Sequence, residues 1–376
     1  MTTNGKATPR SSYFFETFFK DLRYGARSLL KSPMFTVVVT LTLALGIGAN
    51  TAIFTLVNAV MIRSLPIEQP EGLYVLGAST KMGQRVSDTP EERDDSLFSF
   101  PLYQDFAQQE DLFGQAAALS SYPIDVFATE EAPVPGEPME RFQARLVTGN
   151  FFSVLGVPPA LGRTFSPADD QTPAASPVAV ISHGLWTRKF AQDPDIVNRT
   201  IDLSGTRYTV LGVTPPDFRG VTVGHSTDVW VPMAMQAEIE RVPSVLDDRH
   251  TMWLRILGRL ETGVSVEAGE ARVNELYRRI VTDQVGSDLS EESKQTIAAL
   301  GTELVPFSRG FSPLRIRYSK PLLFLTSVVG LVLLIACANV GNLQLARAAS
   351  REQEVALRMA LGSTRNRLLR HFLTEG

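Results

Sequence analysis

Residue types that carry catalysis are present in this 376-residue chain, but their spacing does not assemble a recognisable site. The histidines form neither an H-E-x-x-H helix nor another paired spacing of metal ligands. They stand far apart, at His183, His225, His250 and His371. A G-x-S-x-G turn, which would expose a nucleophilic serine, is also absent. We therefore expect no catalytic residue and no metal site.

One glycine-containing segment comes near a phosphate-binding loop. Residues 220–226 (GVTVGHS) place His225 where a P-loop needs the lysine that neutralises phosphate. We expect this segment to be a turn, and we expect the chain to bind no nucleotide or other cofactor.

The acidic pairs are no more specific than the histidines. They fall in loop-like stretches, where solvated charge is the default interpretation. These pairs are Asp94 with Asp95, Asp169 with Asp170, and Asp247 with Asp248. We therefore predict that the chain is not an enzyme.

Two long apolar runs, residues 34–62 and 321–346, contain no charged residue. They flank the middle of the chain and therefore determine where that middle is placed. Each exceeds the roughly 20 residues that a helix needs to cross a hydrocarbon core, so both are predicted to span a membrane. A soluble core helix is the weaker alternative, because such helices are usually nearer to about 10–14 residues. A cleavable signal peptide is an alternative for the first run, but that run continues well past a signal core of about 7–15 residues.

Basic residues outside the two runs predict the orientation. The chain has 36 lysines and arginines and 40 aspartates and glutamates, and residues 1–33 and 347–376 together hold twelve of the former and five of the latter. Cytoplasmic flanks are enriched in lysine and arginine, so both ends are predicted to be cytoplasmic. The remaining 24 basic and 35 acidic residues give the exported middle a net charge of about −11.

The middle is predicted to be an α+β domain that folds without disulfides. Its roughly 255 residues suffice for one large or two small domains, and the single cysteine, Cys337, lies in the second apolar run. Runs of β-branched and aromatic residues predict strands at 73–76, 141–147, 178–181, 200–203, 208–213, 229–231 and 253–260. Helical spacing predicts helices at 100–109, 184–191 and 266–285, and residues 204–206 predict a hairpin turn.

Residues 1–33 are predicted to form an amphipathic helix before the first run. Its apolar face consists of Phe14, Phe15, Phe18, Phe19, Leu22, Ala26, Leu29 and Leu30. Such a helix would lie in the cytoplasmic membrane interface. Packing against another cytosolic domain is the alternative.

Several segments, in register along nearly the whole chain, resemble one family. They are residues 21–36 (DLRYGARSLLKSPMFT), 43–54, 57–60, 149–157 (GNFFSVLGV), 160–165 (ALGRTF), 177–182 and 208–218. The chain resembles the ABC transporter permeases of the macrolide-exporter type, the MacB/FtsX-like superfamily, and within it the bacterial duplicated orphan permeases. This resemblance implies an α-helical transmembrane protein with a large α+β extracytoplasmic domain between its first and second spans.

The segment after the second run carries the most specific match. Residues 351–365 (REQEVALRMALGSTR) are similar to the family's coupling segment, a short helix and turn that seats on a partner ATPase. An apolar surface ringed by charge suits such a contact. The residues assigned to it are Glu354, Val355, Ala356, Leu357, Arg358, Met359, Ala360, Leu361, Gly362 and Ser363. A basic helix lying on anionic lipid is the alternative.

The resemblance implies a non-catalytic permease subunit of the mechanotransmission or efflux type. Its implied partners are a cytosolic ABC ATPase, a second permease unit (a homodimer mate or a duplicated half) and membrane lipid, without nucleic acid. Small and polar residues in the runs are predicted to pack the spans: Gly46, Gly48, Asn50, Asn58, Asn339, Gly341 and Asn342, with Thr51, Thr55 and Gln344 as further hydrogen-bonding groups. The alternative function is a membrane-tethered ligand-binding or sensor protein without transport activity.

These predictions divide the chain into five parts. They are a cytoplasmic N-terminal helix (1–33), a first span (34–62), an extracytoplasmic MacB-like domain (63–320), a second span (321–346) and a cytoplasmic coupling segment (347–376). Because the family it resembles continues into two further spans, we expect this sequence to be the N-terminal part of a longer permease.

Overall fold

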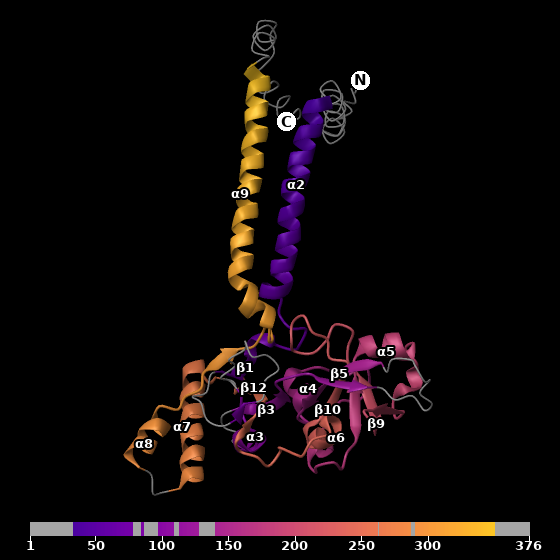
Figure 1. Ribbon diagram of the computed structural model, residues 1–376, viewed down its shortest axis with the longest axis vertical. Helices are drawn as coiled ribbons and strands as arrows, with labels where there is room; N and C mark the ends of the chain where they lie inside the picture. Colours follow the sequence, from indigo (N-terminus) through magenta and orange to yellow (C-terminus); the bar gives the residue numbers. More distant parts are fainter. Residues whose placement is uncertain are drawn as a thin grey trace, which may run out of the picture. The chain divides into compact units, whose positions relative to one another are not determined.

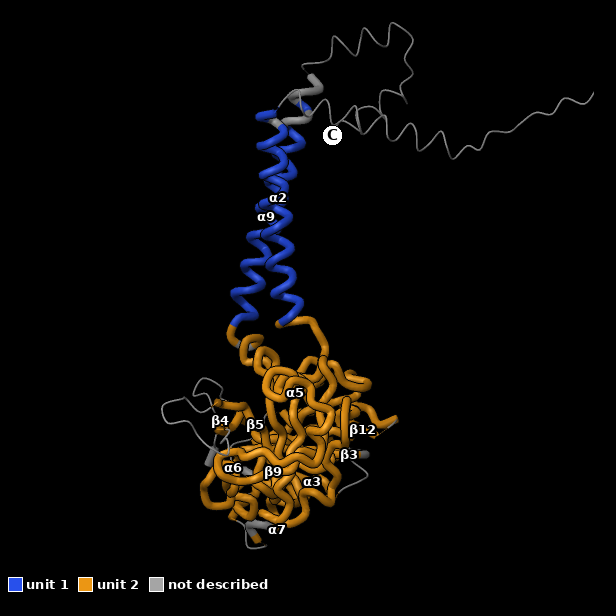
Figure 2. Tube along the Cα trace, turned by 90° about the vertical axis from the view of Figure 1, so that its right-hand side faces the viewer, with its two compact units in different colours: residues 1–59, 318–376 blue, residues 60–317 orange. Residues whose placement is uncertain are grey.

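The computed structural model describes residues 33–77, 84–85, 97–108, 113–127, 140–261, 263–286 and 290–349. The chain divides into two compact units, residues 60–317 and the segments on either side of them (Figure 2). The predicted amphipathic helix before residue 33 and the predicted coupling segment at residues 351–365 lie outside the described residues.

Two long apolar helices flank the larger unit in sequence: α2 (Pro33–Val57) and α9 (Pro313–Ala349). Both are long and apolar enough to cross a membrane, over Thr36–Ile62 and Arg317–Asn342, and most of each candidate span is exposed. The core helix of a soluble protein would instead be mostly buried. α2 is followed by one π-helical turn, η1 (Asn58–Ile62).

The start of α9 is set by its cap rather than by its apolar run. Ser312 Oγ accepts a hydrogen bond from Arg315 N at 3.1 Å. Pro313 takes the first helical position, where its missing N–H is not needed. The helix therefore begins before the apolar run and continues through Pro321, which lies inside it.

The larger unit is built on one mixed sheet of eleven strands (Figure 1). Their order is β13-β1-β12-β3-β5-β10-β7-β9-β6, with β4 also paired to β5 and β8 to β9. The β5–β10 and β7–β9 pairs are parallel. The strands are β1 (Leu73–Leu76), β3 (Phe113–Ser120), β4 (Ile124–Phe127), β5 (Arg141–Val147), β6 (Leu161–Gly162), β7 (Val178–Ile181), β8 (Thr200–Leu203), β9 (Thr206–Val213), β10 (Val229–Pro232), β12 (Leu254–Leu260) and β13 (Leu304–Pro306). Two short strands outside this sheet, β2 (Gln84–Arg85) and β11 (Thr251–Met252), pair with each other.

The sheet is buried on both faces, because apolar side chains occupy both sides of its central strands. In β10, Val229 and Val231 enter one core and Trp230 enters the other. In β12, Leu254 and Ile256 likewise enter the first core. Two cores on one sheet supply the burial that the cysteine-free middle needs in place of disulfides.

Helices cover both faces of the sheet. The first core takes side chains from α3 (Phe100–Ala107), α5 (His183–Phe190), α6 (Gln236–Glu240), α7 (Val266–Val285) and α8 (Glu291–Ala298), and α4 (Phe151–Leu155) fills the second core. Serine caps begin three of these helices: Ser99, Ser182 and Ser265 each accept a hydrogen bond from a backbone N–H three residues on. Short 3₁₀ turns are η2 (Pro70–Gly72), η3 (Pro167–Asp170), η4 (Pro194–Ile196) and η5 (Met233–Met235).

The α+β fold predicted between two long apolar helices is confirmed. The predicted strands and helices are present, with ends that agree or differ by one or two residues, apart from Gln109, which lies outside the described residues. The predicted hairpin turn joins β8 to β9 at Ser204 and Gly205, whose φ angles of 55° and 87° suit a type I′ turn.

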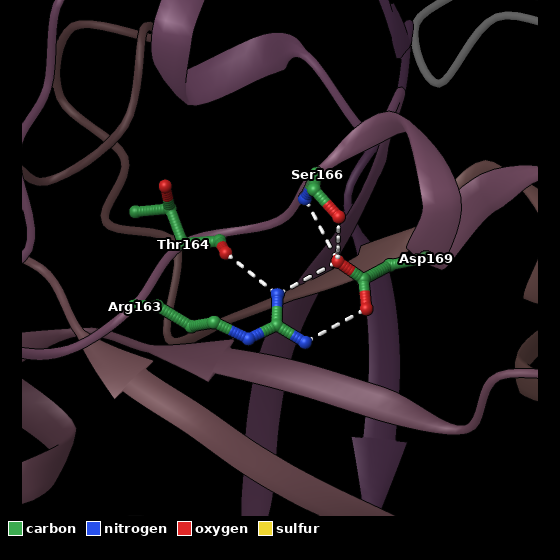
Figure 3. Close-up of polar contacts among 4 residues, drawn as sticks. All are labelled: Arg163, Thr164, Ser166 and Asp169. Atoms are coloured by element: carbon green, nitrogen blue, oxygen red, sulfur yellow. Dashed lines mark hydrogen bonds and ion pairs between the residues drawn. The ribbon is translucent and has the colours of Figure 1, made fainter.

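The prediction that Asp169 and Asp170 carry solvated loop charge is wrong. Asp169 caps η3 by accepting hydrogen bonds from Ser166 N at 2.8 Å and Ser166 Oγ at 2.7 Å. It also forms a bidentate ion pair with Arg163, at 2.7 and 2.9 Å (Figure 3). The family-like segment 160–165 therefore contributes a structural clamp that fixes the turn after β6.

Asp170 joins two elements from the interior of the same turn. It accepts hydrogen bonds from Gly149 N at 3.1 Å and from Ala234 N at 2.7 Å. These bonds connect the start of α4 with η5. Burial raises the pKa of Asp170 to about 6.

We predict that Arg163→Gln weakens the fold in a pH-dependent way. Hydrogen bonding to Arg163 lowers the pKa of Asp169 to about 2, below the value near 3.9 expected in the unfolded chain. The pair therefore stabilises the fold above about pH 4, and this contribution is lost as the pH falls from about 4 to about 2. At pH 7 the free energy of unfolding should fall by about 1 kcal/mol or less, because Arg163 is largely exposed.

An NMR titration of the Asp169 carboxyl measures this effect directly. In Arg163→Gln its pKa should rise toward the ordinary range. The matched control is Arg199→Gln, which removes a longer ion pair to Asp193, at 3.4 Å, and should leave Asp169 unchanged. An Asp169 that titrates identically in Arg163→Gln and in the unsubstituted protein would contradict the prediction.

Candidate functional site

Two regions bear on function: the contact between α2 and α9, and the place where the chain enters and leaves the larger unit. Neither holds a catalytic constellation. In the part of the chain that the structure describes, no group of three or more His, Cys, Asp or Glu side chains could hold a metal ion. His183 packs edge-on against Trp186. The chemistry of both regions is that of packing and hydrogen bonding.

α9 has one less exposed stripe, and α2 approaches it at Gly46. In α9 the least exposed residues recur at alternating steps of four and three, the spacing of a helix-packing seam. They are Leu322, Thr326, Val329, Leu333, Ala336 and Val340. Gly46 of α2 lies at a close approach, because a Cβ there would be 3.2 Å from Leu333 Cδ1 and 3.8 Å from Ala336 Cβ.

The predicted packing residues are divided between this contact and the outer faces of the helices. Gly46 is buried and Asn50 is half-buried. The remaining five are exposed in this chain: Gly48, Asn58, Asn339, Gly341 and Asn342. Thr55 Oγ1 donates to Thr51 O at 2.8 Å within α2, so this bond does not bridge the helices. The side chain of Gln344 lies outside the described residues.

Sequence reasoning missed Leu333 and Ala336 because α9 is apolar on every side. An apolar pattern cannot identify the packed face of such a helix. The available signal was the small side chain of Ala336, since small residues let helices approach closely in membranes.

The chain enters the larger unit at residues 60–65 and leaves it at residues 307–315, and these segments bond to each other. We name them together the joint. Leu65 N donates to Ser308 O at 2.8 Å. Two arginines of the second segment donate to carbonyls of the first, Arg309 Nη1 to Met61 O and Arg315 Nε to Val60 O, each at 3.3 Å. The bonds connect residues 248 and 255 positions apart in sequence.

Arg315 closes the joint through backbone carbonyls. Besides Val60 O, its guanidinium donates to Arg309 O at 3.1 Å and to Gly310 O at 3.3 Å. Burial, and secondly the charge of Arg309, lower the pKa of Arg315, but a guanidinium stays protonated at physiological pH. Its planar fork of donors can satisfy several carbonyls at once, which a lysine point charge does less well.

A third segment, residues 221–223, pairs with the joint. Phe311 N donates to Val221 O at 2.9 Å, and Val223 N donates to Phe311 O at 2.7 Å. This segment belongs to the glycine-containing stretch predicted to be a turn, and positive φ angles at Gly220 and Gly224 are consistent with that prediction. Its pairing with Phe311 is a tertiary contact that no local pattern indicates.

Two buried arginines connect the joint with the central sheet. Arg255 of β12 places its guanidinium 4.0 Å from the centre of the Phe311 ring, a cation–π contact. Arg145 of β5 donates to Thr222 Oγ1 at 3.4 Å and to Ser120 O at 2.9 Å. These contacts connect the joint and residues 221–223 with strands in the middle of the sheet.

These features define a class of protein: an α+β domain inserted between two helices of membrane-spanning length and attached to both through one joint. The chain belongs to the family of the MacB-like periplasmic core domain, whose model matches residues 36–276. The predicted resemblance to MacB-type proteins is thereby confirmed. The narrower resemblance to duplicated orphan permeases stays a prediction.

Curated relatives include export ATP-binding/permease proteins of Pseudomonas. The probable export ATP-binding/permease protein MacB of Pseudomonas entomophila is 27% identical over 231 residues, which are 61% of this chain and 31% of that protein. The pyoverdine export ATP-binding/permease protein PvdT of Pseudomonas savastanoi pv. phaseolicola is 24% identical over 227 residues, 60% of this chain and 31% of that protein. The match thus spans under a third of the length of these relatives.

Solved structures are similar at a low level. The periplasmic region of MacB from Actinobacillus actinomycetemcomitans aligns with 12% identity and a TM-score of 0.39, over 66% of this chain and 98% of that one. The extracellular domain of the noncanonic ABC-type transporter YknZ from Gram-positive bacteria aligns with 15% identity and a TM-score of 0.38, over 62% and 99%. Family membership rests on the sequence match alone.

We predict that Gly310→Ala opens the joint, whereas Gly263→Ala does not. Both glycines have positive φ, so alanine at either position costs roughly 1–2 kcal/mol of backbone strain. At Gly310 a Cβ would also lie 2.4 Å from Val221 O and 2.9 Å from Leu65 Cδ2, but at Gly263 nothing lies within 4 Å. Only Gly310→Ala therefore forces residues 221–223 away from Phe311.

Hydrogen exchange of the full chain measures this opening at the amides of Val223 and Phe311. Their exchange should be about tenfold faster or more in Gly310→Ala, corresponding to at least about 1.4 kcal/mol of local stability. The same amides should be unaffected in Gly263→Ala. Equal exchange in the two variants would show that the joint does not depend on the close contact at Gly310.

Proposed function

We propose that this protein is the permease subunit of an ATP-driven exporter that works by mechanotransmission. The larger unit is extracytoplasmic, the two apolar helices span a bacterial inner membrane with both flanks in the cytoplasm, and a separate cytosolic ABC ATPase supplies the energy. Membership of the MacB-like family and similarity to export ATP-binding/permease proteins support this assignment. We assign ATP hydrolysis to that ATPase, which is the partner that the resemblance to ABC permeases implies.

The joint is the observation that carries the proposal. α9 continues by its own backbone into the joint, and η1 leads into it from α2. Leu65, Phe307 and Phe311 pack the joint onto the second core of the sheet. Close-packed interiors have low compressibility, so they transmit displacement rather than absorb it. Movement of either helix end would therefore move the extracytoplasmic sheet, with no need for a substrate pore through this chain.

The outer faces of α2 and α9 support a second permease unit as a partner. Asn58, Asn339 and Asn342 are exposed in otherwise apolar segments. An amide side chain facing hydrocarbon needs a hydrogen-bond partner, and a helix from a homodimer mate or a duplicated half would supply one. This arrangement fits the duplicated orphan type of permease. Lipid would cover the remaining apolar surface.

We predict that the larger unit is exported and that both flanks are cytoplasmic, because lysine and arginine concentrate in the flanks. Reporter fusions after Lys6 and after Arg370 should be active in the cytoplasm, and a fusion at Gly136 should be active only outside it. The two flank fusions control for expression and insertion. A cytoplasmic signal at Gly136 would remove the transporter proposal.

We predict that Val355→Asp or Met359→Asp abolishes binding of the cognate ATPase. If residues 354–363 form the coupling contact, either substitution places an unpaired carboxylate in an apolar interface, which typically costs several kcal/mol. Affinity should therefore fall about a hundredfold or more. Glu352→Ala is the matched control and should have little effect, because exposed charge pairs contribute only about 0–1 kcal/mol.

Pull-down of the ATPase by the membrane-inserted protein tests this prediction, with insertion of every variant checked in parallel. Normal insertion with full retention of the ATPase by both aspartate variants would mean that this segment lies on lipid instead. A protein that retains no ATPase even without a substitution would favour the alternative function, a membrane-tethered ligand-binding or sensor protein.

A further inference from the structure

A groove on the larger unit has no part in the mechanism proposed above. Its volume is about 940 Å³, near the upper end of the roughly 300–1,000 Å³ typical of ligand pockets. It is bounded by residues 122–127, by the β8–β9 turn, by α6 with the turn that follows it, and by Trp253. All of these elements lie within residues 60–317.

The groove is apolar inside and at its rim. Ile124, Ile239 and Trp253 are buried and form its inner wall. Phe127 and Val242 line it while 39% and 47% exposed. Large hydrophobic side chains with this exposure are rare among the described residues of the larger unit, and two of them line this one groove.

Glu240 and Gln236 shape the groove rather than offer it a free charge. Both carboxylate oxygens of Glu240 already accept hydrogen bonds, one from Tyr122 Oη at 2.7 Å and one from Gln236 Nε2. Gln236 Oε1 accepts a bond from Val245 N at 3.1 Å. This network fixes the turn after α6. The other acid in the lining, Asp125, is paired with Arg141 at 3.2 Å.

Arg241 is the charged lining residue that forms no ion pair with any residue the structure describes. It has a φ of 57° at the end of α6, a conformation uncommon for a residue with a side chain. Its guanidinium lies over the β8–β9 turn, where a Cβ on Gly205 would be 2.3 Å from Nη2. The missing side chain of Gly205 therefore leaves the space that the guanidinium occupies.

We propose that this groove binds a single-chain amphiphile with an acidic head group. Its acyl chain would lie against Phe127, Val242 and the buried inner wall, and its carboxylate, sulfate or phosphate would pair with Arg241. A guanidinium binds such anions through two parallel hydrogen bonds. The assignment rests on charge complementarity beside an apolar groove, and it does not depend on an ATPase or on export.

Photo-labelling locates this ligand on the full chain. The protein is placed in phosphatidylcholine nanodiscs without nucleotide and exposed to a diazirine derivative of laurate, and labelled peptides are identified by mass spectrometry. Saturable labelling should appear in peptides covering residues 122–127 or 241–246. Unlabelled laurate should compete, decanoate should compete roughly tenfold more weakly because it lacks two methylenes, and dodecyltrimethylammonium should not compete at the groove.

Substitutions test the contribution of the Arg241 charge separately from that of the apolar groove lining. Arg241→Gln should weaken groove labelling about tenfold or more, and Arg241→Lys should retain part of it, because lysine keeps the charge but not the two parallel hydrogen bonds. Arg207→Gln is the matched control, because Arg207 is an exposed arginine of the β8–β9 hairpin and lies outside the groove. Labelling of α2 and α9 by probe dissolved in the bilayer reports folding and probe access in every variant.

Three outcomes would overturn the proposal. They are unchanged groove labelling in Arg241→Gln, equal competition by the cationic and anionic amphiphiles, and labelling confined to α2 and α9. None of these outcomes bears on the coupling test, because no ATPase or nucleotide is present.

Discussion

The hydrogen bonds between residues 60–65 and residues 307–315 hold the two ends of the larger unit together, and the remainder of its architecture is arranged around that constraint. β1 and β13, the first and last strands of the sheet in sequence, pair with each other close to the joint. Phe307 N continues this pairing by donating to Leu73 O at 2.8 Å. A domain whose ends meet in this way can be placed between two neighbouring helices without a long linker.

Half-buried polar side chains in this protein join separate elements of the fold. Arg259 donates to the backbone oxygens of Val154 and Gln69, and so ties α4 to the segment that follows the joint. Asp170 connects α4 with η5 through two backbone amides. Such bonds remove the cost of burying backbone groups outside regular secondary structure. The family-like segments 149–157 and 160–165 thus supply core side chains and clamps.

The sheet separates the two regions to which we assign functions. The joint packs with Leu65 and Phe307 on the second core, whereas the groove takes Ile124, Ile239 and Trp253 from the first. Adjacent residues of one strand point to opposite faces, so a strand such as β5 contacts both regions. Arg145 of that strand reaches Thr222 beside the joint, and its neighbour Ala144 pairs with Ile124 of the groove wall. Ligand binding and helix movement would therefore act on opposite faces of the same strands.

Local sequence patterns determined the two apolar helices, the hairpin at Ser204 and Gly205, and the long helix α7, because each depends on hydrophobic length, turn residues or helical period within one segment. They also excluded a phosphate-binding loop. The predicted contact with an ATPase came from a family resemblance and lies outside the described residues.

Tertiary structure decided what Asp169 and Asp170 do, since their partners at Arg163, Gly149 and Ala234 come from separate elements. It also decided the joint and the groove. Arg315 meets Val60 across 255 positions, and the guanidinium of Arg241 lies over a turn that has glycine at position 205, so no local window of sequence contains either contact.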